Sequence, residues 1–259
     1  MWDKDIHKEV VRKAPYSGKT PKQGDEVRIH YTGSRAPDGA TFASSHQSAD
    51  GKPYAFKLGV GAVMEAWDRV VATMKRGELS RFTVPEMYLH GGPPELLDRV
   101  PDDCDSVVYE IELVGVTSIT DVFGDGGVIQ TVVDDGEEYA RPPKAGSEVQ
   151  VGYELASCEG QVLDRKPAMD FKTGGPYPEG VLPGRVLDKA LLSMKRGEVV
   201  TLRCRPQYAF GDAGSPALGV PAGAEVVARL ELKEIYEVED VGRKASWDTG
   251  RGRGIAVLR

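Results

Sequence analysis

The chain has 259 residues, of which 40% are hydrophobic and 28% are charged, so it has enough apolar residues for a packed core and is not expected to be disordered. Its formal net charge of −7 argues against nucleic acid as a partner, because nucleic-acid binding needs a basic surface. It also lacks an apolar run of the ~18 residues needed to span a bilayer, so no membrane association is predicted.

Three features of the sequence indicate the cellular compartment and the need for cofactors: the cysteines, the histidines and the N-terminus. The 3 cysteines are odd in number and far apart, which argues against a disulfide framework and against a CxxC metal site. The 4 histidines have no metal-ligand spacing to one another, so neither a metal nor another cofactor is predicted. The charged segment Met1–His7 has no apolar region typical of a signal peptide. We therefore expect a cytoplasmic protein, with the nucleus as the alternative.

The N-terminal half contains a series of predicted strands around one predicted helix. An apolar run at 6–11 is followed at 27–31 by strict alternation of apolar and polar residues, which indicates a half-buried strand. Apolar residues at helical spacing within 63–74 predict a short helix, and Gly77 supplies the left-handed position that ends it. A second alternating segment at 107–113 predicts another long strand.

The C-terminal half repeats this series. The segment Met74–Glu78 recurs as Met194–Glu198, and 21–27 recurs as 143–149. The repeat unit is about 120 residues long, which is the size of a whole domain. The patterns predict an α+β fold with two tandem domains, each a curved antiparallel sheet packed on one short helix.

The repeat frame also sets the expected domain boundaries. The first domain is predicted at 1–116, and 117–135 is predicted to hold the linker and the leading strand of the second copy. The second domain is predicted at 136–236, followed by a Gly/Arg-rich tail at 237–259. The tail is interpreted as a flexible end, the stump of a helical-repeat extension or the start of a third copy.

Several ordered motifs carry a family resemblance. In the first copy they are Val27–Gly33, Asp38–Ser45, Pro53–Gly59 and Val63–Trp67, and in the second copy Arg205–Gly211 and Val220–Ala224. With these motifs the chain resembles the FKBP family, the macrolide-binding peptidyl-prolyl cis-trans isomerases. The tandem arrangement looks like that of the large multidomain immunophilins of eukaryotes. The resemblance implies an isomerase that assists protein folding, with proline-containing polypeptides as partners and macrolides such as tacrolimus and rapamycin as ligands.

The resemblance also implies a pocket in the first copy. Its catalytic side chains would be Tyr31, Phe42, Phe56, Trp67 and Tyr109, with Trp67 as the floor and the other rings as walls. Its further binding residues would be Tyr54, Val63, Met64 and His90, where the main-chain N–H of Met64 donates to a bound carbonyl. Such a pocket needs no nucleophile or metal, because binding that favours a twisted prolyl amide is sufficient for catalysis.

Two positions in the first copy depart from the family pattern. Ala43 stands where the family has an aspartate, which predicts lower activity and lower macrolide affinity. His90 falls near the position of a family tyrosine, and it is interpreted either as a replacement hydrogen-bond donor or as a solvated loop histidine.

The second copy departs further, with Leu163, Leu187 and Ala228 at the positions of Phe42, Trp67 and Tyr109. It is predicted to be catalytically silent and to serve as a spacer or docking surface. If the first copy is also weak, the alternative function is a protein-binding scaffold or co-chaperone adaptor. Docking to a chaperone through tetratricopeptide repeats is not supported, because the chain has no 34-residue helical repeats.

Overall fold

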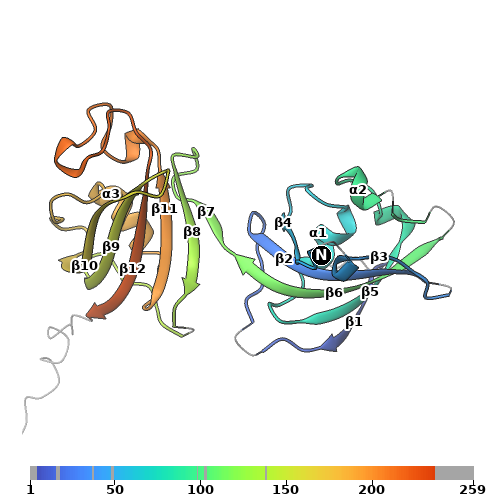
Figure 1. Ribbon diagram of the computed structural model, residues 1–259. Helices are drawn as coiled ribbons and strands as arrows, with labels where there is room; N and C mark the ends of the chain where they lie inside the picture. Colours follow the sequence, from blue (N-terminus) through green and yellow to red (C-terminus); the bar gives the residue numbers. More distant parts are fainter. Residues whose placement is uncertain are drawn as a thin grey trace, which may run out of the picture.

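The computed structural model describes residues 5–15, 18–36, 38–47, 50–97, 99–101, 104–137 and 139–236. The predicted tail at 237–259 lies outside the described residues. Two six-stranded antiparallel sheets form two lobes that follow one another along the chain (Figure 1). None of the helices in the described ranges is long and apolar enough to cross a bilayer.

The first lobe is a sheet that packs on one face against a short helix. Its strands are β1 (His7–Arg12), β2 (Glu26–Arg35), β3 (Thr41–Ser44), β4 (Tyr54–Lys57), β5 (Leu79–Pro85) and β6 (Ser106–Thr117). The order is β1-β5-β6-β2-β3, and β4 also pairs with β2. Along β2 the side chains of Val27, Ile29 and Tyr31 are buried, as the period-two alternation predicts.

The helix of the first lobe, α1 (Glu65–Val71), fills the hollow of this sheet. Its Ala66, Trp67, Val70 and Val71 are buried, and this apolar face belongs to the same core as the inward residues of the strands. The chain also forms a short 3₁₀ helix, η2 (Glu86–Tyr88), and a one-turn helix, α2 (Pro94–Leu97). Sequence patterns did not predict α2, because four residues are too few to show helical periodicity.

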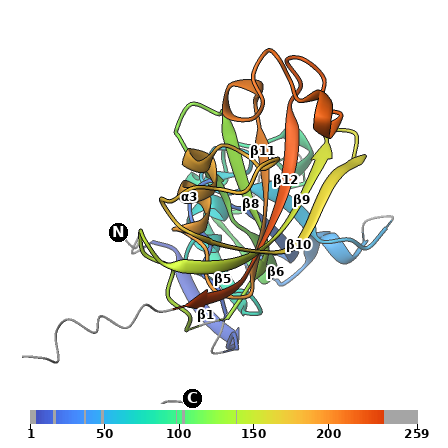
Figure 2. The ribbon, with the colours of Figure 1, turned by 90° about the vertical axis from the view of Figure 1, so that its left-hand side faces the viewer.

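The second lobe repeats the arrangement. Its strands are β7 (Ile119–Asp121), β8 (Val128–Asp135), β9 (Glu148–Ser157), β10 (Val162–Lys172), β11 (Glu198–Cys204) and β12 (Val226–Tyr236), in the order β10-β9-β12-β11-β8-β7. Its helix α3 (Gly184–Leu191) lies beside the sheet, as Figure 2 shows with this lobe toward the viewer. Short 3₁₀ helices, η3 (Pro206–Tyr208) and η4 (Pro216–Leu218), take the place of η2 and α2.

The repeated Met-Lys-Arg-Gly-Glu segment forms the same turn in both lobes. Gly77 has φ 88° and donates its N–H to the Leu113 carbonyl at 2.7 Å, while Gly197 has φ 77° and donates to the Leu232 carbonyl at 2.7 Å. A positive φ favours glycine, so the turn requires this residue in both copies. The repeat therefore encodes a link between the helix and the last strand of each sheet.

The two lobes are joined by ion pairs as well as by the chain. Asp135, at the end of β8, lies 2.6 Å from Lys19 Nζ and 3.4 Å from Arg76 Nη1, and both cations belong to the first lobe. All three side chains are partly exposed, so each pair is worth at most about 1 kcal/mol. These contacts bias the relative orientation of the lobes without adding much stability.

Candidate active site

The predicted pocket rings of the first lobe converge on Trp67. The ring centroids of Tyr31, Tyr54, Phe56 and Tyr109 lie 4.5, 5.9, 6.3 and 5.6 Å from Trp67. These rings come from β2, β4, α1 and β6, which are far apart in the sequence. Three of the four contacts are edge-to-face, the geometry that aromatic quadrupoles prefer.

Phe42 joins the cluster through Tyr109 because Gly33 lies between them. Gly33 pairs with Ala43 on β3 and with Tyr109 on β6. A Cβ at Gly33 would lie 2.7 Å from the Phe42 ring and 2.8 Å from the Tyr109 ring. Only glycine therefore leaves room for the edge contact of these two rings, whose centroids are 5.9 Å apart. Gly33 is not among the site residues predicted from the aromatic positions, although it directly follows Tyr31 and Thr32 in β2.

A cavity of about 550 Å³ opens beside this ring cluster. Its apolar lining is formed by Tyr31, Pro53, Tyr54, Ala55 and Leu96, and its polar lining by Ser44, Ser45, Asp50, Lys52, Glu95 and Arg99. Of the predicted site residues, Tyr31 and Tyr54 line the cavity. The cavity therefore gives access to one side of the cluster, through the two tyrosines.

The other rings lie beneath that lining. Trp67 and Tyr109 are each 1% exposed and Phe56 is 6% exposed, so the tryptophan predicted as the pocket floor is covered by the protein itself. Leu96 on α2 is buried, belongs to the same core and lines the cavity beside Tyr31. The sequence identifies the ring positions, but it gives no signal for the α2 segment that lines the cavity beside them.

Val63 and Met64, just before α1, are also buried. Gly92 has φ 79° and packs on the peptide that joins them, since a Cβ at Gly92 would lie 2.7 Å from the Met64 nitrogen. The Met64 N–H was expected to donate to a bound carbonyl. In this structure the loop backbone at Gly92 lies over that amide, so a ligand reaches it only if the loop moves.

His90 lies on the surface, outside the cavity lining. Its side chain is 65% exposed, and Nε2 is 3.2 Å from the Glu65 carboxylate. The His90 carbonyl accepts a hydrogen bond from the Glu65 N–H at 2.9 Å. Of the two interpretations of His90, this placement favours the solvated loop histidine.

The hydroxyl groups at the site stay protonated at neutral pH. Burial raises the pKa of Tyr31, although the charge of Arg99 opposes that rise. Burial also raises the pKa of Tyr54, with smaller contributions from Tyr31 and Glu95, and burial raises that of Tyr109 further. Neutral phenols are hydrogen-bond donors, which is the form that binds a peptide carbonyl.

One buried polar atom of the site has no hydrogen-bond partner in the described part of the chain, and one expected polar side chain is absent. The buried indole Nε1 of Trp67 has no hydrogen-bond partner among the described residues. Ala43, which replaces the family's aspartate, is 5% exposed and belongs to the core. No group of three or more His, Cys, Asp or Glu within the described ranges is placed to hold a metal ion.

The corresponding region of the second lobe lacks the ring cluster. Leu187 and Ala228, at the Trp67 and Tyr109 positions, are 1% and 0% exposed and fill the core with aliphatic groups. Tyr153, at the Tyr31 position, is buried, and its hydroxyl has no hydrogen-bond partner among the described residues. The rings that remain nearby include the pair Phe171 and Tyr177, whose centroids are 5.2 Å apart, but no central tryptophan gathers them.

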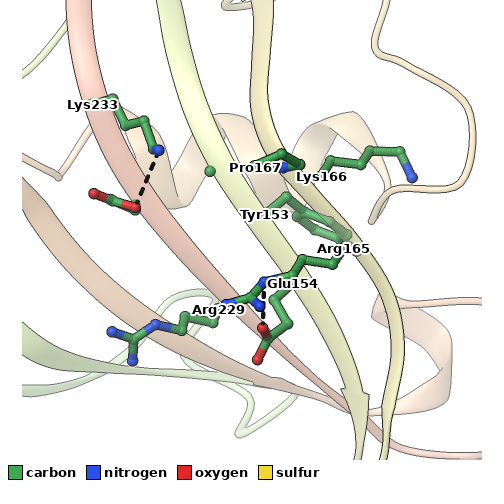
Figure 3. A pocket seen from close by; sticks show the side chains of 9 residues that line it. Tyr153, Glu154, Arg165, Lys166, Pro167, Arg229 and Lys233 are labelled. Atoms are coloured by element: carbon green, nitrogen blue, oxygen red, sulfur yellow. Dashed lines mark ion pairs between the residues drawn. The ribbon is translucent and has the colours of Figure 1, made fainter.

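The second lobe instead has a cavity of about 420 Å³ over Gly152, on the solvent side of its sheet (Figure 3). Its charged lining consists of Glu154, Arg165, Lys166, Arg229, Glu231 and Lys233. Arg165 lies 3.0 Å from Glu154 and Lys233 lies 3.7 Å from Glu231. In Figure 3 Lys166 and Arg229 point away from each other, so the four basic groups do not converge on one anion.

Comparison with known proteins identifies the class. Residues 17–114 and 139–233 match the family model described as FKBP-type peptidyl-prolyl cis-trans isomerase. The chain therefore belongs to this family and carries two copies of its domain. The predicted family and the predicted α+β fold of two tandem domains are confirmed.

Curated relatives align with this chain across both copies. Peptidyl-prolyl cis-trans isomerase FKBP4 from Bos taurus is 34% identical over 244 residues, covering 92% of this chain and 49% of the relative. FK506-binding protein 59 from Drosophila melanogaster is 30% identical over 233 residues, covering 89% of this chain and 50% of the relative. The chain thus spans about half the length of these curated relatives.

A solved structure is similar over most of the chain. It is the crystal structure of the 3 FKBP domains of wheat FKBP73, with a TM-score of 0.61 and 27% identity, covering 90% of this chain and 96% of that one. The similarity extends across both lobes, which supports reading each lobe as one FKBP domain.

Proposed function

We propose that the first domain catalyses the cis–trans isomerisation of X–Pro peptide bonds, that it assists protein folding in this way, and that the second domain is not catalytic. The observation that carries this proposal is the ring cluster centred on Trp67, beside a cavity lined by Tyr31 and Tyr54. The partners are proline-containing polypeptides.

The chemistry of isomerisation suits such a site. Rotation about the amide bond has a barrier of about 18–20 kcal/mol, because the planar amide has partial double-bond character. The twisted transition state loses that resonance and part of the carbonyl dipole. An aromatic surrounding penalises the polar planar amide more than the twisted one, and only such differential binding accelerates the reaction. The phenol of Tyr31, kept neutral by burial, is available to donate to a peptide carbonyl.

The covered state of the site predicts a slow enzyme. A prolyl ring that enters the cavity meets Tyr31 and Tyr54 first, and it reaches the buried Trp67 only when the residues that cover the tryptophan move. The opening motion costs free energy, which reduces the apparent affinity by the fraction of open molecules. Together with Ala43 in place of the aspartate, this predicts weak binding of tacrolimus and rapamycin.

The same observation favours a second candidate function. If those covering residues move too rarely, the first domain binds proline-containing segments at the cavity without isomerising them. The protein then serves as a scaffold or adaptor.

An assay on the full chain separates these functions. We expect wild-type protein to accelerate isomerisation of a neutral X–Pro peptide, and Trp67→Leu to lower kcat/KM by at least about tenfold, or about 1.4 kcal/mol of transition-state stabilisation. The matched control is Leu187→Ala, at the equivalent position of the second domain, which keeps the activity. Circular dichroism verifies that both variants fold.

Two outcomes would contradict the catalytic proposal. A wild-type rate equal to that in buffer would leave the adaptor function. Unchanged catalysis by Trp67→Leu would place the active site elsewhere in the chain.

We also propose a cytoplasmic or nuclear location. The exposed thiol of Cys158 forms no disulfide, which suits a reducing compartment. Fluorescence imaging of the tagged full-length protein tests this, and a secretory pattern would contradict it.

A further inference from the structure

A gap in the pairing of β2 lies next to the first-domain cavity. On the side away from β6, β2 pairs with β4 over Glu26–Ile29 and with β3 over Thr32–Ser34, and neither ladder includes His30 or Tyr31. The side chain of Ser45 fills this gap. Its Oγ accepts a hydrogen bond from the Tyr31 N–H at 2.9 Å and lies 3.3 Å from the Tyr31 carbonyl oxygen. Since Tyr31 and Ser45 both line the cavity, this hydroxyl holds the backbone of a tyrosine that a bound proline would meet.

His30 reaches the same hydroxyl from the other face of the sheet. Successive residues of a strand point to opposite faces, so His30 faces away from the buried Tyr31. Its Nδ1 lies 3.1 Å from Ser45 Oγ. Its ring stacks on His46 of the 3₁₀ helix η1 (Ser45–Gln47), with centroids 4.2 Å apart and an interplanar angle of 18°. His30 is half-buried and His46 is exposed, so the histidine pair connects solvent to the cavity through one serine hydroxyl.

Other elements bring two charged groups toward His30. Glu112 lies directly opposite on β6, and its carboxylate already forms an ion pair with Arg12. Arg28, two residues earlier on the same face of β2, packs against β6. β3 has no charged residue, and His46 is the titratable side chain of η1. Two positive charges on the stacked rings would repel each other, so the pair takes up one proton more readily than two.

The charge of His30 decides where the Ser45 proton goes. A serine hydroxyl has one proton, which it donates either to His30 Nδ1 or to the Tyr31 carbonyl. In a neutral histidine Nδ1 accepts a hydrogen bond in one tautomer and donates one in the other. In a charged histidine both ring nitrogens carry protons, so Nδ1 donates to Ser45 and the serine proton goes to the Tyr31 carbonyl. Charging His30 thus selects the single arrangement in which Ser45 holds both backbone groups of Tyr31.

We propose that His30 is a positioning residue for the isomerase site, and that its protonation, acting through Ser45, fixes Tyr31 at the cavity and raises the activity of the first domain. This inference rests on the proposed function, because Tyr31 acts in that site. Histidine is the side chain that ordinarily changes its charge between about pH 8 and pH 5, so the activity depends on pH in this range.

Three other groups at the cavity keep their protonation state over that range. Burial raises the pKa values of Tyr31 and Tyr54, so both phenols stay neutral. Hydrogen bonds from the Lys52 N–H and side chain lower the pKa of Asp50, so that carboxylate stays charged. The titration of His30 is therefore separated from those of these three groups.

The pH profile of catalysis by the full chain tests the proposal, with an X–Pro peptide that has blocked ends and no titratable side chain. We expect kcat/KM to rise about threefold from about pH 8 to about pH 6, as expected for one hydrogen bond gained. In His30→Gln the profile should be flat, because glutamine gains no charge. His46→Phe keeps a ring to stack on His30 and should retain the rise. The matched control is His7→Gln on β1, which should keep the wild-type profile.

Amide NMR gives a readout that does not depend on catalysis. As the pH falls, the Tyr31 N–H signal should move together with the ring signals of His30, both in wild type and in His7→Gln. In His30→Gln the Tyr31 signal should keep its position over the same range. Circular dichroism verifies that each variant folds.

The inference is overturned if His30→Gln keeps the wild-type pH profile, or if the Tyr31 N–H signal does not follow the titration of His30. Failure of the proposed function looks different, because the wild-type rate would then equal that in buffer at every pH. In that case the affinity for the same peptide, titrated by NMR, replaces kcat/KM, and the same dependence on His30 is required.

Discussion

The two domains share one frame and differ in what fills it. In both, a glycine after the helix donates its N–H to the last strand at 2.7 Å, and a half-buried strand carries a tyrosine at the same place. Around that tyrosine the first domain gathers aromatic rings, whereas the second has Leu187 and Ala228. The second core is buried without aromatic residues at these two positions, so the fold itself does not require the rings. The comparison shows that the scaffold and the candidate site are specified by different residues.

The largest expected effect concerns Gly33, where the rings leave no room for a Cβ. We expect Gly33→Ala to destabilise the first domain by up to about 3 kcal/mol, because overpacking forces Phe42 and Tyr109 apart. Catalysis should fall with it. Chemical denaturation followed by NMR signals of each domain measures the change.

Its matched control is Gly152→Ala on a strand of the second domain. A Cβ there would meet the Lys233 side chain at 3.1 Å, and that flexible chain can move aside. We expect a change within about 0.5 kcal/mol. Equal effects of the two substitutions would show that the ring cluster is not tightly packed.

The next-largest expected effect concerns Glu78 and Glu198, which occupy equivalent positions in the two domains and have pKa values shifted in opposite directions. Burial alone would raise the pKa of Glu78, but Lys8 at 2.5 Å, the Ser80 hydroxyl and the Lys75 N–H together bring it below its ordinary value. Burial raises the pKa of Glu198, where the Lys195 N–H compensates only in part. Glu78→Gln should therefore destabilise the first domain by about 2 kcal/mol at pH 7, since it leaves the charge of Lys8 without its anion and only with the hydrogen bond to the Thr73 carbonyl. Glu198→Gln should stabilise the second domain by up to about 1 kcal/mol.

The stability of the two domains should depend on pH in opposite ways for the same reason. The stability from Glu78 is present above its unfolded pKa and is lost as pH falls through its lower folded pKa, below 4.5. Glu198 binds its proton more tightly when folded, so its contribution grows as pH falls through a folded pKa above 4.5. Domain-resolved hydrogen exchange from pH 7 to pH 4 measures both. Identical pH profiles in wild type and the two Gln variants would contradict the assignment.

The smallest effect concerns the contact between the domains. Asp135→Asn removes the ion pairs with Lys19 and Arg76, and it should change the stability of either domain by less than about 1 kcal/mol. The relative orientation of the domains should become more variable, as measured by residual dipolar couplings. Glu225→Gln, which breaks an exposed pair inside the second domain, is the control and should leave the couplings unchanged. Unaltered couplings in Asp135→Asn would show that the linker alone sets the orientation.

Much of this molecule follows from local sequence. The alternation in β2, the helical spacing before Met74 and the glycine at 77 are periodic or steric signals, and they hold wherever the chain is placed. The aromatic residues around Trp67 likewise lie in motifs that can be recognised in the sequence. The repeat at about 120 residues shows that the pattern occurs twice.

Only the tertiary structure decided whether those rings are open to a ligand. Gly92 and Leu96 come from a segment with no periodicity. Gly92 packs on the peptide nitrogen of Met64, and Leu96 joins the core that contains Trp67, so both depend on contacts between residues distant in sequence. The ion pair of Lys8 with Glu78 and the opposite charges of Glu95 and Arg99 at the cavity also depend on where strands and loops meet. Such contacts have no local signature, because burial and charge environment are properties of the packed chain.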